Sequence, residues 1–304
     1  MRLVRPSLEY PEVPLYSVLE EAAARWGEKT AVIHQDKEIS FKELNGRADR
    51  LATALADMGI GRGDKVALYL PNSPEFIIGF FGTLKAGGVP TSMNPSYKER
   101  EVAHQYSDSE AKAIIAHERL YPAIEKAARE VPIANVILVG ERGAEGAHLL
   151  AELLERYRPD PPEVELDVKE DLAALPYTSG TTGRPKGVML THYNLLANWR
   201  QFRDGIAVSE RDIILIFLPF YHIYGSMLMG GAIYAGATQV LMERFAPLET
   251  LELIERYRPT ILYVVPPALL ALINVENLAD YDLSSLNYII SAAAPLPKEV
   301  AEAA

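Results

Sequence analysis

The chain has 304 residues, and 49% of them are hydrophobic, which is enough for a sizeable core in two lobes rather than one. Its formal net charge of −11 argues against a surface that binds nucleic acid or an anionic membrane. The absence of cysteine excludes disulfides, cysteine-ligated metals and a cysteine nucleophile.

Short apolar runs alternate with amphipathic stretches along the chain, a pattern typical of parallel βα units. The first helix is expected at 15–26, and the second begins at a capping box formed by Ser40 and Glu43. The third is expected to begin at Pro74 and to run to the glycines at 87 and 88. Further helices are expected at 98–106, 119–130, 149–157, 192–202, 248–257 and 268–274. Strands are expected at 30–33, 66–70, 89–92, 113–116, 136–139, 172–177, 188–191, 213–217, 238–241, 261–264 and 288–291.

The stretch 213–242 carries no Lys, Arg, Asp or Glu and is long enough to suggest a membrane span. Pro219, His222 and several glycines interrupt it, and its pattern reads strand, turn, helix, strand. We therefore predict a buried strand and a covering helix instead of a span. Residues 1–14 contain charges and prolines but no apolar run, so we expect no signal peptide and a cytoplasmic location.

The stretch from Tyr177 to Gly187, Y-T-S-G-T-T-G-R-P-K-G, is the most informative part of the chain. Its three glycines let the backbone bend sharply and bring N–H groups close to a ligand. Hydroxyl side chains and the cations Arg184 and Lys186 lie among them. This set of donors predicts a loop that holds the phosphates of a nucleotide such as ATP.

The spacing differs from those of the best-known phosphate loops. A Walker loop has a lysine followed by Ser or Thr, but Lys186 is followed by Gly187, and no G-x-G-x-x-G triplet occurs. Expected strands on both sides make it a loop between two strands. The alternative from composition alone is an ordinary Gly/Thr surface loop.

Two more segments follow expected strands directly. Residues 218–225, L-P-F-Y-H-I-Y-G, place His222 and Tyr224 where ligands bind in open α/β sheets. Residues 291–296, S-A-A-A-P-L, present small side chains that let a flat ring approach the backbone. From the residues alone, a structural histidine and an ordinary turn of small residues remain the alternatives.

Together these segments resemble the AMP-forming acyl-activating enzymes: acyl-CoA synthetases, peptide-synthetase adenylation domains and luciferase-like proteins. The resemblance extends over 16–26, 41–59 and 82–95, which read like the N-terminal part of fatty-acid and aryl CoA ligases. One departure is Ala292, which stands where glycine is common in the family.

The resemblance implies roles for individual residues. Residues with a catalytic role would be Lys186, His222 and Thr182. Residues that hold the nucleotide would be Thr178, Ser179, Gly180, Thr181, Thr182, Gly183, Lys186, Gly187, Ala292, Ala293, Ala294 and Pro295. Residues that contact the acid would be His222, Tyr224, Gly225 and Ala293.

It also implies the large N-terminal domain of an adenylate-forming enzyme, an α/β fold of two βα lobes with largely parallel sheets flanked by helices. We expect 1–55 and 205–304 to form one subdomain, on the acid and adenine side. Residues 56–204 would form a second, which carries the phosphate loop. The small C-terminal lid domain is expected to be absent. No metal ligand is assigned, because the glutamate that helps to hold Mg²⁺ in the family is expected beyond Ala304.

The implied activity is an ATP-dependent acyl-CoA synthetase for a medium- or long-chain fatty acid, with coenzyme A as co-substrate. We expect the chain alone to be inactive or severely impaired. The alternatives are an aryl-CoA ligase, with Tyr224 lining an aromatic pocket, a non-catalytic nucleotide-binding protein, and a phosphotransferase. The expected partners are small molecules, without nucleic acid, and a homodimer stays open. Scarce glutamine and absent cysteine favour a thermophilic source.

Overall fold

Two parallel sheets organise the computed structural model, which describes residues 8–178 and 185–304. The six-stranded sheet has the order β15-β14-β12-β13-β1-β2, and all its pairs are parallel except β1–β2. Its strands are β1 (Thr30–His34), β2 (Lys37–Ser40), β12 (Ile213–Ile216), β13 (Thr238–Leu241), β14 (Ile261–Val264) and β15 (Tyr288–Ser291). The stretch 213–242 forms β12, a helix and β13, as the sequence predicts.

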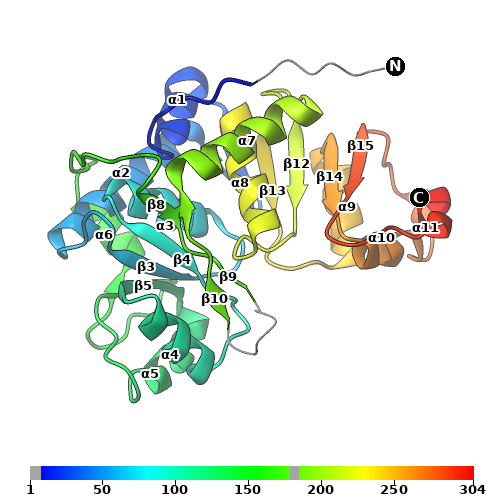
Figure 1. The fold of residues 1–304 in the computed structure, drawn as a ribbon. Coiled ribbons are helices and arrows are strands. Elements are labelled where there is room, and N and C mark those ends of the chain that lie inside the picture. Colours follow the sequence, from blue (N-terminus) through cyan, green and yellow to red (C-terminus); the bar gives the residue numbers. More distant parts are fainter. Residues whose placement is uncertain (1–7, 179–184) are drawn as a thin grey trace.

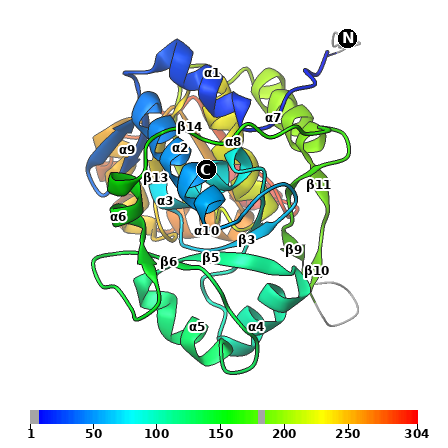
Figure 2. The same cartoon turned by 90° about the vertical axis from the view of Figure 1, so that its left-hand side faces the viewer.

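The five-stranded sheet is parallel throughout and has the order β4-β3-β5-β6-β7. Its strands are β3 (Lys65–Tyr69), β4 (Val89–Ser92), β5 (Ala111–His117), β6 (Val136–Val139) and β7 (His148–Leu149). Figures 1 and 2 show helices on both of its faces, with α4 (Glu99–Asp108) and α5 (Tyr121–Ala127) on one. On the other face lie α2 (Phe41–Asp57), α3 (Pro74–Lys85) and α6 (Leu150–Arg156). The α/β class predicted from the sequence is confirmed.

The remaining helices lie around the six-stranded sheet or beside it (Figure 1). They are α1 (Ser17–Trp26), α7 (His192–Ile206), α8 (Ile223–Ala235), α9 (Pro247–Tyr257), α10 (Pro266–Ile273) and α11 (Lys298–Ala303). In the described part of the chain, no helix is both long and apolar enough to cross a bilayer.

Side-chain caps begin several of the helices. Ser73 accepts a hydrogen bond from the Phe76 N–H at the start of α3, and Ser40 accepts one from the Glu43 N–H at the start of α2. The capping box predicted at Ser40 is only half formed, because the Glu43 carboxylate pairs with Arg47 one turn further along. Helix α2 therefore starts where the sequence predicts, with one of the two expected bonds.

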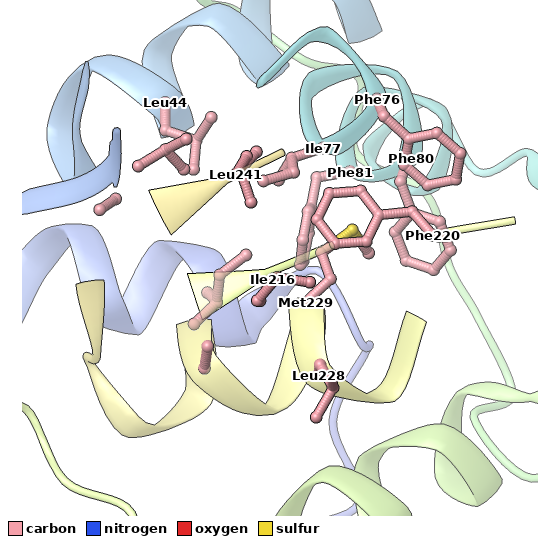
Figure 3. Close-up of a cluster of buried hydrophobic side chains, with 14 of the residues drawn as sticks. Leu44, Phe76, Ile77, Phe80, Phe81, Ile216, Phe220, Leu228, Met229 and Leu241 are labelled. Atoms are coloured by element: carbon pink, nitrogen blue, oxygen red, sulfur yellow. The ribbon is translucent and has the colours of Figure 1, made fainter. Parts of the chain in front are cut away.

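A cluster of buried hydrophobic side chains extends through both sheets and the helices between them. Figure 3 shows the region in which the aromatic rings of α3 approach Phe220 and Met229. The rings of Phe76 and Phe220 lie 5.4 Å apart between centroids, and Phe80 and Phe81 both contact Trp199 of α7. This shared core fixes the two sheets relative to each other.

Two glycines let α7 lie very close to α8. A Cβ atom on Gly230 would lie 2.0 Å from the ring of Trp199, and one on Gly231 would lie 2.2 Å from the ring of Phe202. Trp199 is completely buried as a result.

Three expectations about strands were wrong. The sequence reading missed β2, which follows a tight turn at Gln35 and Asp36, both in the left-handed region with φ of 49° and 63°. The single strand expected at 172–177 is divided into β8 (Leu172–Ala174) and β9 (Tyr177–Thr178). In the single strand expected at 188–191, only β11 (Leu190–Thr191) forms, after a separate strand β10 (Lys186–Gly187). The exposed side chains of Val188 and Met189 lie between them.

Candidate functional site

A cavity of about 500 Å³ lies where the carboxyl ends of strands from both sheets meet. Parallel strands point the same way, so the loops that follow them gather at one edge. Segments after β3, β4, β12, β13 and β14 all contribute to the wall. The lining residues are Pro71, Asn72, Asn94, Pro95, Ser96, Phe217, Leu218, Pro219, Tyr221, Glu243, Arg244, Phe245, Val265, Pro267 and Ala268.

His222 follows directly after this wall and caps the N-terminus of α8. Its side chain is exposed, and its Nδ1 accepts a hydrogen bond from the Tyr224 N–H at 3.2 Å. Because Nδ1 is the acceptor, the neutral imidazole carries its proton on Nε2. The His222 N–H donates to the Pro219 carbonyl at 3.0 Å, which closes a tight turn. The imidazole is thus held as a donor at the carboxyl edge of the sheet.

Tyr224 lies in the first turn of α8, half-buried and edge-on to Tyr263, with ring centroids 6.5 Å apart. Burial raises the pKa of Tyr224 to about 12. Its hydroxyl is buried and has no hydrogen-bond partner among the described residues. Gly225 is buried, and a Cβ atom there would lie 2.1 Å from the Pro219 carbonyl oxygen. The glycine is needed for α8 to start this close to the turn.

The expected phosphate loop is the connection of a β-hairpin. Strand β9 (Tyr177–Thr178) pairs antiparallel with β10, and Thr178 lies opposite Lys186. Both of these side chains are exposed. The predicted residues Ser179, Gly180, Thr181, Thr182 and Gly183 lie outside the described residues.

The base of the hairpin is tied to the five-stranded sheet and its helix α4 (Figure 2). The hydroxyl of Tyr177 donates to the carboxylate of Asp108, and burial with this bond raises the pKa of Tyr177. The hydroxyl of Thr91 in β4 donates to the Leu175 carbonyl at 2.9 Å, and the Leu175 N–H donates to the Pro90 carbonyl. Both anchors therefore hold the strand that leads into the predicted loop.

The segment of small residues follows β15 at the edge of the six-stranded sheet. The Ala292 N–H donates to the Val264 carbonyl at 3.2 Å, while Ala293, Ala294 and Pro295 are exposed. Ala293 has a φ of 71°, a left-handed conformation that residues with a Cβ atom rarely adopt. The unusual backbone thus falls one residue after Ala292, the position at which the sequence departs from the family pattern.

The sequence profile of the AMP-binding enzyme family matches residues 19–304. The chain belongs to the AMP-binding enzyme family. A long-chain-fatty-acid–CoA ligase of Bacillus subtilis is 32% identical over 96% of this chain and 57% of its own length. A 4-coumarate–CoA ligase of Petroselinum crispum is 34% identical over 98% of this chain and 56% of its own length.

Solved structures of the AMP-binding family share the fold. A long-chain-fatty-acid-CoA ligase from Archaeoglobus fulgidus superposes with a TM-score of 0.91 at 31% identity, covering 98% of this chain and 61% of its own. The chain thus spans a little over half the length of these relatives, and it matches the N-terminal part predicted from its motifs.

Within this AMP-binding domain, the structure brings part of the predicted site together. His222 follows β12 and Ala292 follows β15, so both lie at the same edge of one sheet. Thr178 and Lys186 lie on the separate hairpin. Within residues 8–178 and 185–304, there is no group of three or more His, Asp or Glu side chains that could hold a metal ion.

Sequence reasoning missed the contribution of Asn72. Its side chain is 3% exposed and forms hydrogen bonds with the segment that leads to His222. The available signal was its position, because an amide directly after a buried strand of a parallel sheet lies at the ligand-binding edge.

Proposed function

We propose that the chain is the nucleotide- and acid-binding part of an AMP-forming acid–CoA ligase. In the first half-reaction, a carboxylate oxygen of the acid attacks the α-phosphorus of ATP, and pyrophosphate leaves with the electrons of the broken P–O bond. In the second, the sulfur of coenzyme A attacks the acyl carbon, AMP leaves, and the thiol proton goes to solvent. Neither step requires a covalent bond to the protein.

The observation that carries this proposal is the cavity at the meeting carboxyl edges, with His222 held beside it as a donor. A protonated Nε2 fits the orientation of a carboxylate by a charge-assisted hydrogen bond. Apolar side chains such as Phe217 and Phe245 in the cavity wall suit the organic part of an acid.

The hairpin supplies the charge for the nucleotide side of the reaction. Lys186 and Thr178 lie opposite each other at its base, so a ligand in the loop meets an ammonium group and a hydroxyl. We propose that Lys186, with Thr181 and Thr182 of the loop, neutralises the charge that develops on the leaving pyrophosphate. The exposed backbone of 292–295 suits the approach of a flat adenine ring. ATP and coenzyme A would both be substrates, with Mg²⁺ bound to the ATP phosphates.

A medium- or long-chain fatty acid is the proposed acid. An acyl chain of this length would need an apolar tunnel, and Phe217 in the cavity wall supports an entrance to one. Leu228 and Met229 of α8 belong to the buried core, so they do not support a continuation of the tunnel along that helix. Tyr224 supports an aryl acid as the second candidate, because its ring lies in the first turn after His222. One relative is named for long-chain fatty acids and another for 4-coumarate, which keeps both classes open.

We also propose that the chain divides into two subdomains, 1–55 with 205–304, and 56–204. The six-stranded sheet draws its strands from the first set and the five-stranded sheet from the second, which supports this division.

Acid-dependent exchange of labelled pyrophosphate into ATP tests the proposal directly. Exchange with one class in a panel of fatty and aryl acids, followed by thioester formation with coenzyme A, is expected from the full-length protein. We expect much weaker exchange from residues 1–304 alone. ADP as the product would indicate a phosphotransferase, and ATP binding without exchange or thioester would indicate a non-catalytic protein.

Lys186→Ala in the full-length protein is expected to lower kcat/KM for ATP roughly 10- to 150-fold, the loss of one charge-assisted hydrogen bond. Lys298→Ala is the matched control, because Lys298 lies exposed on α11 and pairs with Glu302 one turn away. Equal activity of the Lys186 variant and wild type would remove the basis of the assignment.

A further inference from the structure

Asn72 connects the carboxyl edges of the two sheets by both ends of its side-chain amide. Asn72 is the third residue after β3 of the five-stranded sheet, with Leu70 and Pro71 between them. Its Nδ2 donates to the Leu218 carbonyl at 3.0 Å, and its Oδ1 accepts from the Phe220 N–H at 2.8 Å. Leu218 and Phe220 follow β12 of the six-stranded sheet.

Both bonds are buried, which makes them costly to lose. Asn72 is 3% exposed, Leu218 5% and Phe220 1%. A backbone N–H or C=O left without a partner in such a place costs about 1–3 kcal/mol. Aspartate at this position would keep one acceptor but would place a second oxygen against the Leu218 carbonyl. The site therefore specifies an amide, with a donor on one side and an acceptor on the other.

The two bonded residues flank Pro219, whose carbonyl receives the His222 N–H. The path from Asn72 to the imidazole is therefore short and made of fixed contacts. It continues through the Tyr224 N–H, which donates to Nδ1 of His222 and orients the ring. The contact of Phe76 with Phe220, 5.4 Å between ring centroids, supports the same segment from α3.

We propose that Asn72 is a positioning residue for the acid half of the reaction: it clamps 218–220 so that His222 is held at the carboxylate of the substrate. This inference rests on the proposed function. It assigns no contact with the substrate to Asn72 itself. In the described part of the hairpin that carries Lys186, residues 177–178 and 185–187, no hydrogen bond reaches Asn72 or 218–220, so ATP binding is expected to be independent of the clamp.

The test compares Asn72→Ala and Asn72→Asp with Ser73→Ala in the full-length protein. Ser73 is the matched control, since it is adjacent and 5% exposed, but its side chain only caps α3. Pyrophosphate exchange should show a roughly 10- to 100-fold fall in kcat/KM for the acid in both Asn72 variants, because small displacements of an orienting group have effects of this size. KM for ATP should stay within about twofold of wild type. A variant that is only less stable would have a smaller active fraction, without a specific fall in kcat/KM for the acid. This result is expected for Ser73→Ala.

Hydrogen–deuterium exchange provides a readout that does not need activity. Peptides covering 216–224 should exchange faster in Asn72→Ala than in wild type and in Ser73→Ala, with the Phe220 amide most affected. Unchanged exchange there would overturn the clamp. Faster exchange with unaltered acid kinetics in an active enzyme would overturn the positioning role. Faster exchange in a protein that activates no acid would overturn the proposed reaction, and with it that role, but not the contact itself.

Discussion

The imidazole Nδ1 of His192 accepts a hydrogen bond from the backbone N–H of Leu15 at 2.9 Å, across 177 residues of sequence. His192 is the first residue of α7, immediately after the hairpin and β11, and its side chain is 2% exposed. The bond ties the segment before α1 to the helix that follows the β9–β10 hairpin.

The stability of the protein is expected to fall below pH 6.5 because of His192. Burial lowers the pKa of His192 from 6.5 to about 4, so the unfolded chain binds a proton that the folded chain does not. The stabilisation is complete above pH 6.5 and is lost as the pH falls toward 4. This group alone should remove about 2 kcal/mol between pH 7 and pH 5. Urea unfolding of wild type and His192→Gln at both values measures it. If His192→Gln lost as much unfolding free energy between pH 7 and pH 5 as wild type, the assignment of this loss to His192 would be contradicted. His148→Gln is the control, because His148 is exposed.

Lys85→Ala is expected to destabilise the protein by about 3 kcal/mol or more. The Lys85 side chain is 2% exposed, and its Nζ lies 2.6 Å from carboxylate oxygens of both Glu20 and Asp49. Removing Lys85 leaves the carboxylate of Asp49, whose side chain is only 14% exposed, without this cation, whereas that of Glu20 is 44% exposed and can be solvated. Lys42→Ala breaks the exposed pair with Glu28 and should cost less than about 1 kcal/mol. Similar unfolding free energies for the two variants would show that the buried lysine contributes no more to stability than the exposed one.

Gly230→Ala is expected to destabilise the protein by about 1–3 kcal/mol, because the added methyl group would overlap the Trp199 ring unless α7 and α8 separate. Gly205→Ala makes the same change in α7, where nothing lies within 4 Å of the new Cβ atom. It should stabilise by roughly 0.5–1 kcal/mol through helix propensity. Opposite signs in thermal and urea unfolding are the expected result, and equal signs would contradict the close packing.

Ala293→Gly is expected to stabilise the chain by roughly 0.5–1 kcal/mol, since glycine adopts a φ of 71° without the steric penalty of a Cβ atom. The neighbouring Ala294→Gly serves as control. Ala294 does not have a positive φ, so glycine there only adds entropy to the unfolded chain and should destabilise. Unfolding free energies that rank the two variants the other way round would refute a strained backbone at Ala293.

Most of the regular elements were predictable because their signals are local. The strands expected at 136–139 and 261–264 match β6 and β14 to the residue, since both are short runs of apolar residues. Strand β2 was missed because three of its four residues are polar and only Ile39 is buried. A left-handed turn at non-glycine residues also has a weak signature.

The site was predictable as a set of segments and not as an arrangement. Motifs identified His222 and Lys186, because particular residue types recur at fixed spacing within a segment. The contact of Asn72 with Leu218 joins positions 146 residues apart, and its geometry depends on how the two sheets face each other. No local pattern carries that information. The roles given to His222, to Lys186 and to the loop residues from Ser179 to Gly183 remain predictions.

Five different connections, each after its own strand, supply the wall of the central cavity. Each can vary in length or chemistry while the strand that precedes it keeps its partners. A single framework can in this way be adapted to many ligands by exchanging one connection at a time. Proteins descended from a common ancestor would then differ in the ligand that they bind long before they differ in fold.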